Sequence, residues 1–276
     1  MIFKVLFISL HIIALDCFTH RKQLPSTYSK ENETWTGKWF PAKPDFLNDN
    51  FRSAEKNITI EVTPQVDDVV EISSSFCDDG QTNLIMDWDD DPSDFICLTT
   101  ERYSPNFEKP PLLELYNVPK AYKPYPECMN VSITYDEDIP TFGNHRIVWP
   151  KYGEYEYIPR QRWLHTVEHG GIVMLYHPCA DEQQVNKLQR LVRKCLYRHV
   201  ITPSRMLSPE MPLALISWGR RLQMSFVQKE TIVDFIKSNA LKGLEHPSKD
   251  GEYAYGLLEK AEIISDFSDS TLCPGL

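Results

Sequence analysis

Residues 163–179 read WLHTVEHGGIVMLYHPC, and this stretch determines the centre of the predicted fold. Residues 172–176 within it are all apolar, so 171–177 predicts a buried β-strand. Pro159 lies upstream and the glycine pair 170–171 lies immediately before the strand, which leaves about ten residues at most for a helix that carries HTVEH. We therefore expect a short His/Glu turn that leads into a buried strand.

A helical pattern follows this strand. Asp181, with Gln184 three residues later, has the arrangement of a capping box, and apolar residues at helical spacing predict a helix over 182–197. Further strands are predicted at 199–202, 213–218 and 222–226, and a second helix at 229–239. The order strand, helix, strand, strand, strand, helix favours an α+β fold in which a mostly antiparallel sheet packs with two helices.

The rest of the chain divides by composition. Lys4 precedes an apolar run that is too short to span a bilayer, which is typical of a signal peptide. Six prolines between Ser104 and Glu127 indicate an extended segment, and short strands are predicted at 57–62, 67–73 and 130–135. We expect a signal peptide at 1–18, an extended, Pro-rich N-terminal region with short strands at 19–127, an α+β core domain at 128–247, and a C-terminal tail at 248–276.

Two features predict secretion or residence in the lumen of the secretory pathway. Three sequons, at Asn32, Asn57 and Asn130, are N-glycosylation acceptors without a central proline. Six cysteines remain after Cys17, which falls at the edge of the signal segment; they are Cys77, Cys97, Cys128, Cys179, Cys195 and Cys273. In an oxidising compartment they predict up to three disulfides, and all 15 pairings stay open.

The charge disfavours a nucleic-acid partner, and the hydropathy disfavours a membrane-spanning helix. A formal charge of -10 disfavours nucleic acid, because phosphate binding depends on clustered lysine and arginine. No apolar run beyond the signal segment approaches the roughly 20 residues of a membrane-spanning helix, so we expect no transmembrane span in the mature chain. The sequence leaves open which protein or small ligand the chain binds.

The segment HTVEH matches the H-x-x-E-H pattern of inverted zinc peptidases. On a helix, His165 and His169 would lie one turn apart and could hold zinc while Glu168 polarises a water molecule. The helix is short, however, and Glu182 and Glu230 lie at the starts of the later helices, where neither is placed as a third ligand. A metal-dependent hydrolase that uses these three residues is therefore an alternative, and no catalytic residue is assigned.

A different metal site remains open. If the GNH loop folds over HTVEH, His145 would join His165, Glu168 and His169 in a ligand set suited to zinc or copper. In a second alternative, these side chains form a purely structural hydrogen-bonded network in an interaction module. His177 fits packing in the strand better than ligation. The acidic segment DWDDDPSD, 87–94, lacks the glycine and glutamate of an EF-hand and predicts a solvated loop.

Three segments carry a resemblance to known proteins: GNHRIVWPKYGEY, LHTVEHGGIVMLYHPC and LALISWGR. Together, over about 140–247, they resemble the core of the tumour protein p53-inducible protein 13 family and of a widespread bacterial domain of unknown function. The matching positions are Gly143, His145, Trp149, Gly153, Tyr155, His165, Glu168, His169, Gly170, Gly171, Trp218, Gly219 and Arg220. The cysteines resemble those of the animal branch, whose members carry a membrane anchor after this domain; this chain shows none, which favours secretion.

The resemblance implies a loose association with growth restraint and no established catalytic residues. We therefore expect a disulfide-braced α+β domain that acts by binding and carries a candidate His/Glu site for zinc or copper.

Overall fold

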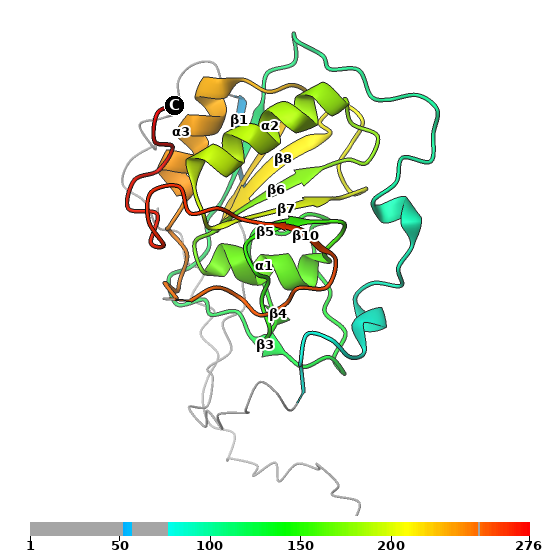
Figure 1. Ribbon diagram of the computed structural model, residues 1–276, viewed down its shortest axis with the longest axis vertical. Helices are drawn as coiled ribbons and strands as arrows, with labels where there is room; N and C mark the ends of the chain where they lie inside the picture. The colour runs from blue at the N-terminus through cyan, green and yellow to red at the C-terminus, as the bar shows by residue number, and fades with distance from the viewer. Residues whose placement is uncertain (1–51, 57–76, 248) are drawn as a thin grey trace, which may run out of the picture. The chain divides into compact units, whose positions relative to one another are not determined.

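The computed structural model describes residues 52–56, 77–247 and 249–276 (Figure 1). Eight strands form one sheet in the order β1-β2-β9-β8-β6-β7-β5-β10. Their bounds are β1 Arg52–Lys56, β2 Leu112–Tyr116, β5 Gly153–Tyr155, β6 Ile172–Tyr176, β7 His199–Pro203, β8 Leu213–Ser217, β9 Arg220–Met224 and β10 Leu257–Lys260. A separate pair contains β3 Pro126–Glu127 and β4 His145–Arg146. The α-helices are α1 Arg160–Glu168, α2 Glu182–Cys195 and α3 Lys229–Asn239, and two 3-10 turns lie at Leu84–Met86 and Pro92–Asp94.

The predicted α+β class is confirmed. The sheet is antiparallel at the pairs β2–β9, β9–β8, β8–β6 and β5–β10, and parallel at β1–β2, β6–β7 and β7–β5. The two long helices predicted from apolar spacing are α2 and α3, and the short helix that carries HTVEH is α1.

Strand β6 lies in the middle of the sheet, which explains its uninterrupted apolar run. It pairs in parallel with β7 and antiparallel with β8, so neither of its edges is free. Ile172 and Met174 point into the core that includes α2 and α3. Val173 and Leu175 point into a second core on the opposite face, which includes α1. Because successive side chains alternate between two buried faces, every position of the strand must be apolar.

Helices α2 and α3 cover one face of the sheet (Figure 1). The Asp181 side chain accepts a hydrogen bond from the backbone N–H of Gln184 at 3.0 Å, which confirms the predicted N-cap. Leu188, Val192 and the other inward residues of α2 are buried, and α3 buries the side of its helix that includes Ile232 and Ile236.

Helix α1 packs on the other face and ends where the glycines require. Trp163, Leu164 and Val167 are buried in the core beneath the sheet. Gly170 has a φ of 77°, and the Gly171 N–H donates to the Thr166 carbonyl at 2.9 Å. Glycine is the residue that adopts a positive φ easily, so Gly170 ends the helix and turns the chain into β6.

The segments on either side of 128–247 also contribute to the sheet. Strand β2, from the Pro-rich segment, pairs with β9, and β10, from beyond residue 247, pairs with β5. The strand predicted at 130–135 is wrong: this segment forms no ladder, and its chain is held by contacts such as Tyr135 Oη donating to the Asn144 carbonyl at 2.6 Å. The strands predicted at 57–62 and 67–73 and the signal segment at 1–18 lie outside the described residues.

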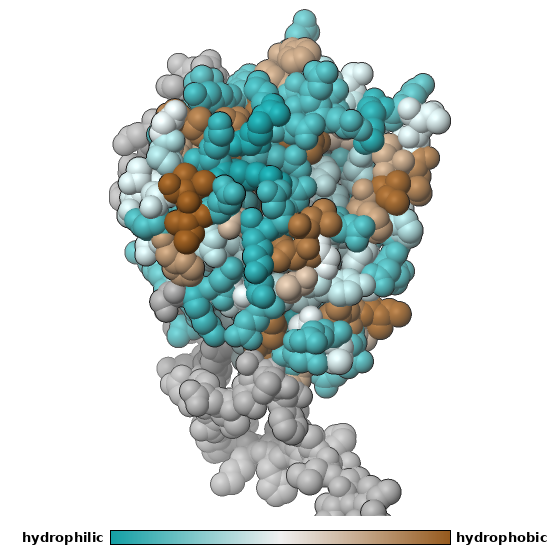
Figure 2. Space-filling model, in the orientation of Figure 1, coloured by the Kyte–Doolittle hydropathy of each residue, from teal (hydrophilic) through white to brown (hydrophobic). Residues whose placement is uncertain are grey.

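Three disulfides confirm that the six cysteines pair. The bonds are Cys77–Cys128, Cys97–Cys179 and Cys195–Cys273. They tie the segment at 77–97 and the C-terminal residues to the sheet and its helices. Among the described residues, no helix has the length and apolarity needed to cross a membrane. On the face seen in Figure 2, apolar side chains form small separate groups in a hydrophilic surface.

Candidate metal centre

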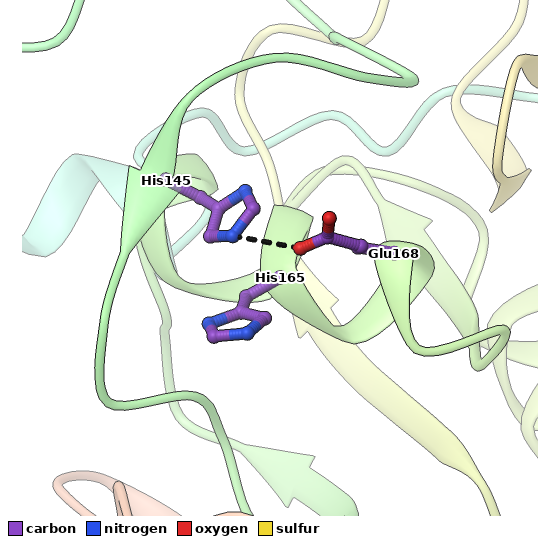
Figure 3. A group of neighbouring side chains, drawn as sticks. All are labelled: His145, His165 and Glu168. Carbon is purple, nitrogen blue, oxygen red and sulfur yellow. Dashed lines mark ion pairs between the residues drawn. The ribbon is translucent and has the colours of Figure 1, made fainter. Parts of the chain in front are cut away.

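Three of the predicted site residues meet at one point. His165 and Glu168 are three residues apart on α1, so both project from the same side of the helix. His145 comes from β4 and lies over them (Figure 3). One potential ligand atom from each residue lies within 4.8 Å of those from the other two. The convergence of the GNH loop with HTVEH, on which the metal hypothesis depends, is therefore present.

The hydrogen bonds of the two imidazoles determine which nitrogen is free. His145 Nδ1 is 3.0 Å from the Gly143 carbonyl oxygen, and His165 Nδ1 is 2.7 Å from the Arg146 carbonyl oxygen. A carbonyl oxygen only accepts hydrogen bonds, so each Nδ1 carries the proton and donates. In a neutral ring this leaves Nε2 with a lone pair. Histidines that bind metals commonly have this arrangement, in which the other ring nitrogen is anchored to a backbone carbonyl.

The three side chains are buried. The exposed fraction is 1% for His145, 9% for His165 and 7% for Glu168. Burial lowers the pKa of His165 well below its usual value, and the neighbouring His145 and His169 lower it further. His165 is therefore neutral near pH 7, which is the protonation state that binds a metal ion.

His145 is held in place by its neighbour Arg146, which the sequence did not single out. The Arg146 guanidinium is fully buried and donates to both carboxylate oxygens of Asp87, at 2.8 and 2.6 Å. It also donates to the carbonyl oxygens of Cys128 and Val131. Because the Arg146 carbonyl also receives the His165 hydrogen bond, this one residue connects the segment at 77–97 with both histidines.

The acidic segment at 87–94 thus differs from the predicted solvated loop at two positions. Asp87 pairs with Arg146, and Asp94 pairs with Arg205 at 2.7 Å; both carboxylates are buried. Two arginines that are distant in sequence neutralise these charges, which is why local composition could not reveal the burial.

His169 lies beside the group rather than within it. Its ring stacks on that of His165 at a centroid distance of 4.5 Å and packs at a tilt against that of Trp149 at 4.4 Å. Burial lowers the pKa of His169 to about 4, and the charges of His145 and Arg198 contribute to the shift. His177 lies apart, at the end of β6, where it stacks on Tyr103 and accepts a hydrogen bond from the Cys179 backbone N–H.

Glu245 is a second residue near the site that the sequence did not indicate. Its Oε2 lies 3.6 Å from His169 Nδ1. Glu245 follows α3, about 75 residues after α1, and an exposed glutamate after a helix has no local pattern that marks a site.

Residues 127–252 match the family described as Protein of unknown function (DUF3105). The matched region contains His145, His165, Glu168 and Glu245 together. It agrees with the resemblance to a domain of unknown function, whereas nothing in the match supports the more specific relation to the p53-inducible protein 13 family. No curated protein and no solved structure gave a match.

Proposed function

We propose that this protein is a metal-binding protein of the secretory pathway, in which His145, His165 and Glu168 hold one zinc or copper ion. Its role is binding rather than catalysis. Two imidazoles and one carboxylate form a mixed nitrogen and oxygen donor set, which metal ions of intermediate softness such as zinc and copper prefer.

One contact carries the proposal. His145 Nε2 lies 3.0 Å from Glu168 Oε2. With the ring proton on Nδ1, a neutral His145 turns a lone pair toward a carboxylate oxygen, and two acceptors at this distance repel each other. Either a second proton on the ring or a bound cation removes the repulsion. The nearby His165 also has a free Nε2, and this favours a cation, which would use all three groups at once.

The spacing of the ligand atoms fits an ion after a small adjustment. Bonds of about 2.0 to 2.2 Å place the ligand atoms of a tetrahedral zinc site roughly 3.3 to 3.6 Å apart. All the ligand atoms here lie within 4.8 Å of one another, so the longest separation would have to shorten by at most about an ångström and a half.

The burial of the group supports binding over hydrolysis. A hydrolytic zinc site keeps one coordination position open toward a cleft that admits substrate, whereas a structural site is closed. Each of the three side chains here is 9% exposed or less, which leaves little access for a peptide.

Elemental analysis of the purified, secreted chain tests the proposal. We expect about one equivalent of zinc or copper in the wild type and none in a His145→Ala, His165→Ala double variant. His177→Ala is the matched control, because it removes a histidine outside the group, and it should keep the metal. Circular dichroism checks that the double variant is folded. Equal metal content in the wild type and the double variant would refute the metal site.

The compartment is part of the same proposal. Three disulfides are compatible with secretion or a luminal location, and Asn130 is exposed, as a glycosylation acceptor must be. We also propose, from the sequence resemblance alone, a relation to the p53-inducible protein 13 family and through it to growth restraint. A secreted metal-binding domain of that kind would act through a protein or small-ligand partner.

A further inference from the structure

A cavity of about 410 Å³ lies beside the loop that carries His145. Gly143 and Asn144, which precede this histidine, form part of its lining, whereas His145, His165 and Glu168 do not line it. Pockets that bind small molecules have volumes of roughly 300 to 1,000 Å³. The cavity is therefore large enough for a small ligand and is separate from the candidate metal centre.

Aromatic rings form the apolar part of the cavity. Tyr116, Tyr135 and Phe142 line it, and the ring centroids of Tyr116 and Phe142 are 6.0 Å apart. One cation already lies near this wall, because Lys56 Nζ is 5.2 Å from the centroid of the Tyr116 ring. Aromatic faces attract cations at such distances. In the described part of the chain, no lysine or arginine lies over the ring of Phe142, so a cationic ligand would not compete with a protein group there.

The positive charge of Lys56 is already neutralised. Its Nζ lies 3.0 Å from Glu114 Oε1 and 2.8 Å from Glu137 Oε1. Arg221 pairs with the same two glutamates, at 2.6 and 3.2 Å. Two cations and two carboxylates therefore balance one another, and no other lysine or arginine of the described residues lines the cavity. An anionic ligand would find no free positive charge in this lining.

Two further carboxylates give the cavity a negative charge. Glu127 and Asp136 line it, and neither forms an ion pair with any lysine or arginine that the structure describes. Glu127 Oε1 accepts a hydrogen bond from the side-chain amide of Asn144 at 3.1 Å, and an amide does not neutralise its charge. Because a cleft lined by one sign of charge attracts ligands of the opposite sign, the lining favours a cation.

Hydrogen bonds hold the wall of the cavity in place and leave one buried hydroxyl without a partner. Tyr135 Oη donates to the Asn144 carbonyl at 2.6 Å, and Asn144 Oδ1 accepts from the Tyr125 backbone N–H at 2.8 Å. Thr141 also lines the cavity, is 1% exposed, and its Oγ1 has no hydrogen-bond partner among the described residues. Buried polar atoms are nearly always paired, and an ammonium N–H in the cavity would supply the missing partner.

We propose that this cavity binds a small organic cation, an ammonium group attached to an apolar body. Glu127 and Asp136 neutralise the ammonium group, and the apolar body packs against Phe142. A bare metal ion would use the carboxylates but gain nothing from the aromatic wall. The inference goes beyond the proposed metal site and does not depend on it, because none of the three proposed metal ligands lines the cavity.

Binding of 2-phenylethylamine to the folded, disulfide-bonded chain tests the proposal by isothermal titration calorimetry. The matched ligand is 2-phenylethanol, in which an uncharged hydroxyl replaces the ammonium group. We expect the amine to bind about tenfold more tightly than the alcohol, because hydrogen bonds to charged groups are the stronger ones. In a Glu127→Gln, Asp136→Asn double variant, which keeps the size of both side chains, the Kd of the amine should rise by about tenfold.

The control variant is Glu108→Gln, Asp234→Asn, which changes the net charge equally at two exposed carboxylates outside the cavity. Its Kd should stay within about twofold of the wild type, because solvent screens distant charges. Circular dichroism checks that both variants are folded. An amine held by a metal ion instead would keep its Kd in the Glu127→Gln, Asp136→Asn variant, and that result overturns the proposal. Absence of binding to the wild type, equal Kd values for the amine and the alcohol, or an equal loss in the control variant overturns it as well.

Discussion

Asp78→Asn is expected to destabilise the fold severely, because Asp78 neutralises a fully buried arginine. Arg162, on α1, is 0% exposed and donates to both oxygens of Asp78, at 2.6 and 2.8 Å. Asp78 is 2% exposed and also accepts from the backbone N–H groups of Gly80 and Val148, at 3.0 and 2.8 Å. The substitution keeps the size of the side chain but leaves the guanidinium without its counter-charge and turns an amide NH₂ toward it.

Removing one partner of a buried ion pair typically costs about 3 to 5 kcal/mol, since the other charge stays in a medium that solvates it poorly. Domains of ordinary stability unfold with about 5 to 15 kcal/mol, so a loss of this size is a large share of the total. Urea denaturation of the oxidised protein, followed by tryptophan fluorescence and circular dichroism, measures it.

The control is Glu182→Gln, which breaks an ion pair with Arg102. Because the Glu182 side chain is 72% exposed and that of Arg102 is 46% exposed, water replaces the lost contact, and the urea midpoint should stay nearly unchanged. Replacing both buried partners, as Asp78→Leu with Arg162→Met, should recover part of the lost stability, because no unpaired charge then remains, while the N–H groups of Gly80 and Val148 still lose their acceptor. A loss below about 1 kcal/mol in Asp78→Asn would refute the reasoning, since it would mean that water or another group solvates Arg162.

Three further predictions concern pH, the disulfides and glycosylation. Burial lowers the pKa of His199 to about 4, below its unfolded value of about 6.5, so the unfolded chain takes up the proton first as pH falls. The contribution of this residue to the free energy of unfolding should therefore be largest above pH 6.5 and should fall by roughly 3 kcal/mol between pH 6.5 and 4. Urea titrations across that range should show a smaller dependence of the unfolding free energy on pH in His199→Gln than in the wild type. An unchanged dependence on pH contradicts the burial argument. Peptide mapping of a non-reducing digest should recover Cys97 linked to Cys179 and the two other pairs given above, and any other pairing would show that the sheet is assembled differently. Intact-mass analysis of the secreted protein should show loss of one glycan in Asn130→Gln, whereas an unchanged mass would remove this site from the proposal.

Local patterns predicted the helices well. The N-cap at Asp181 and the apolar spacing after it specify α2 whatever the rest of the chain does, and the same holds for the apolar side of α3. The strand predicted at 130–135 failed for the opposite reason: a strand exists only with a partner, and alternation cannot show whether a free edge lies nearby. The burial of Asp87 and Asp94 was missed because their arginine partners lie far along the chain.

The candidate site divides in the same way. His165 and Glu168 share one side of α1 by helical spacing alone, so the sequence indicated them together. His145 joins the site only if the GNH loop closes over the helix, and the sequence does not show whether the loop closes. Glu245 had no signal at all, since an exposed glutamate after a helix is ordinary until the segment that follows α3 is seen to bond to the end of α1.

By itself, the sequence determined where α1 must end and that β6 must be buried, because glycine freedom and an unbroken apolar run act within a few residues of the chain. It also indicated six cysteines that would pair. Only the tertiary structure decided which cysteines are partners, which carboxylates neutralise the buried arginines, and that His145 meets Glu168 and Glu245 meets His169. These contacts join residues that are separated by tens of positions, and their energies depend on distance and burial, which one-dimensional order does not contain.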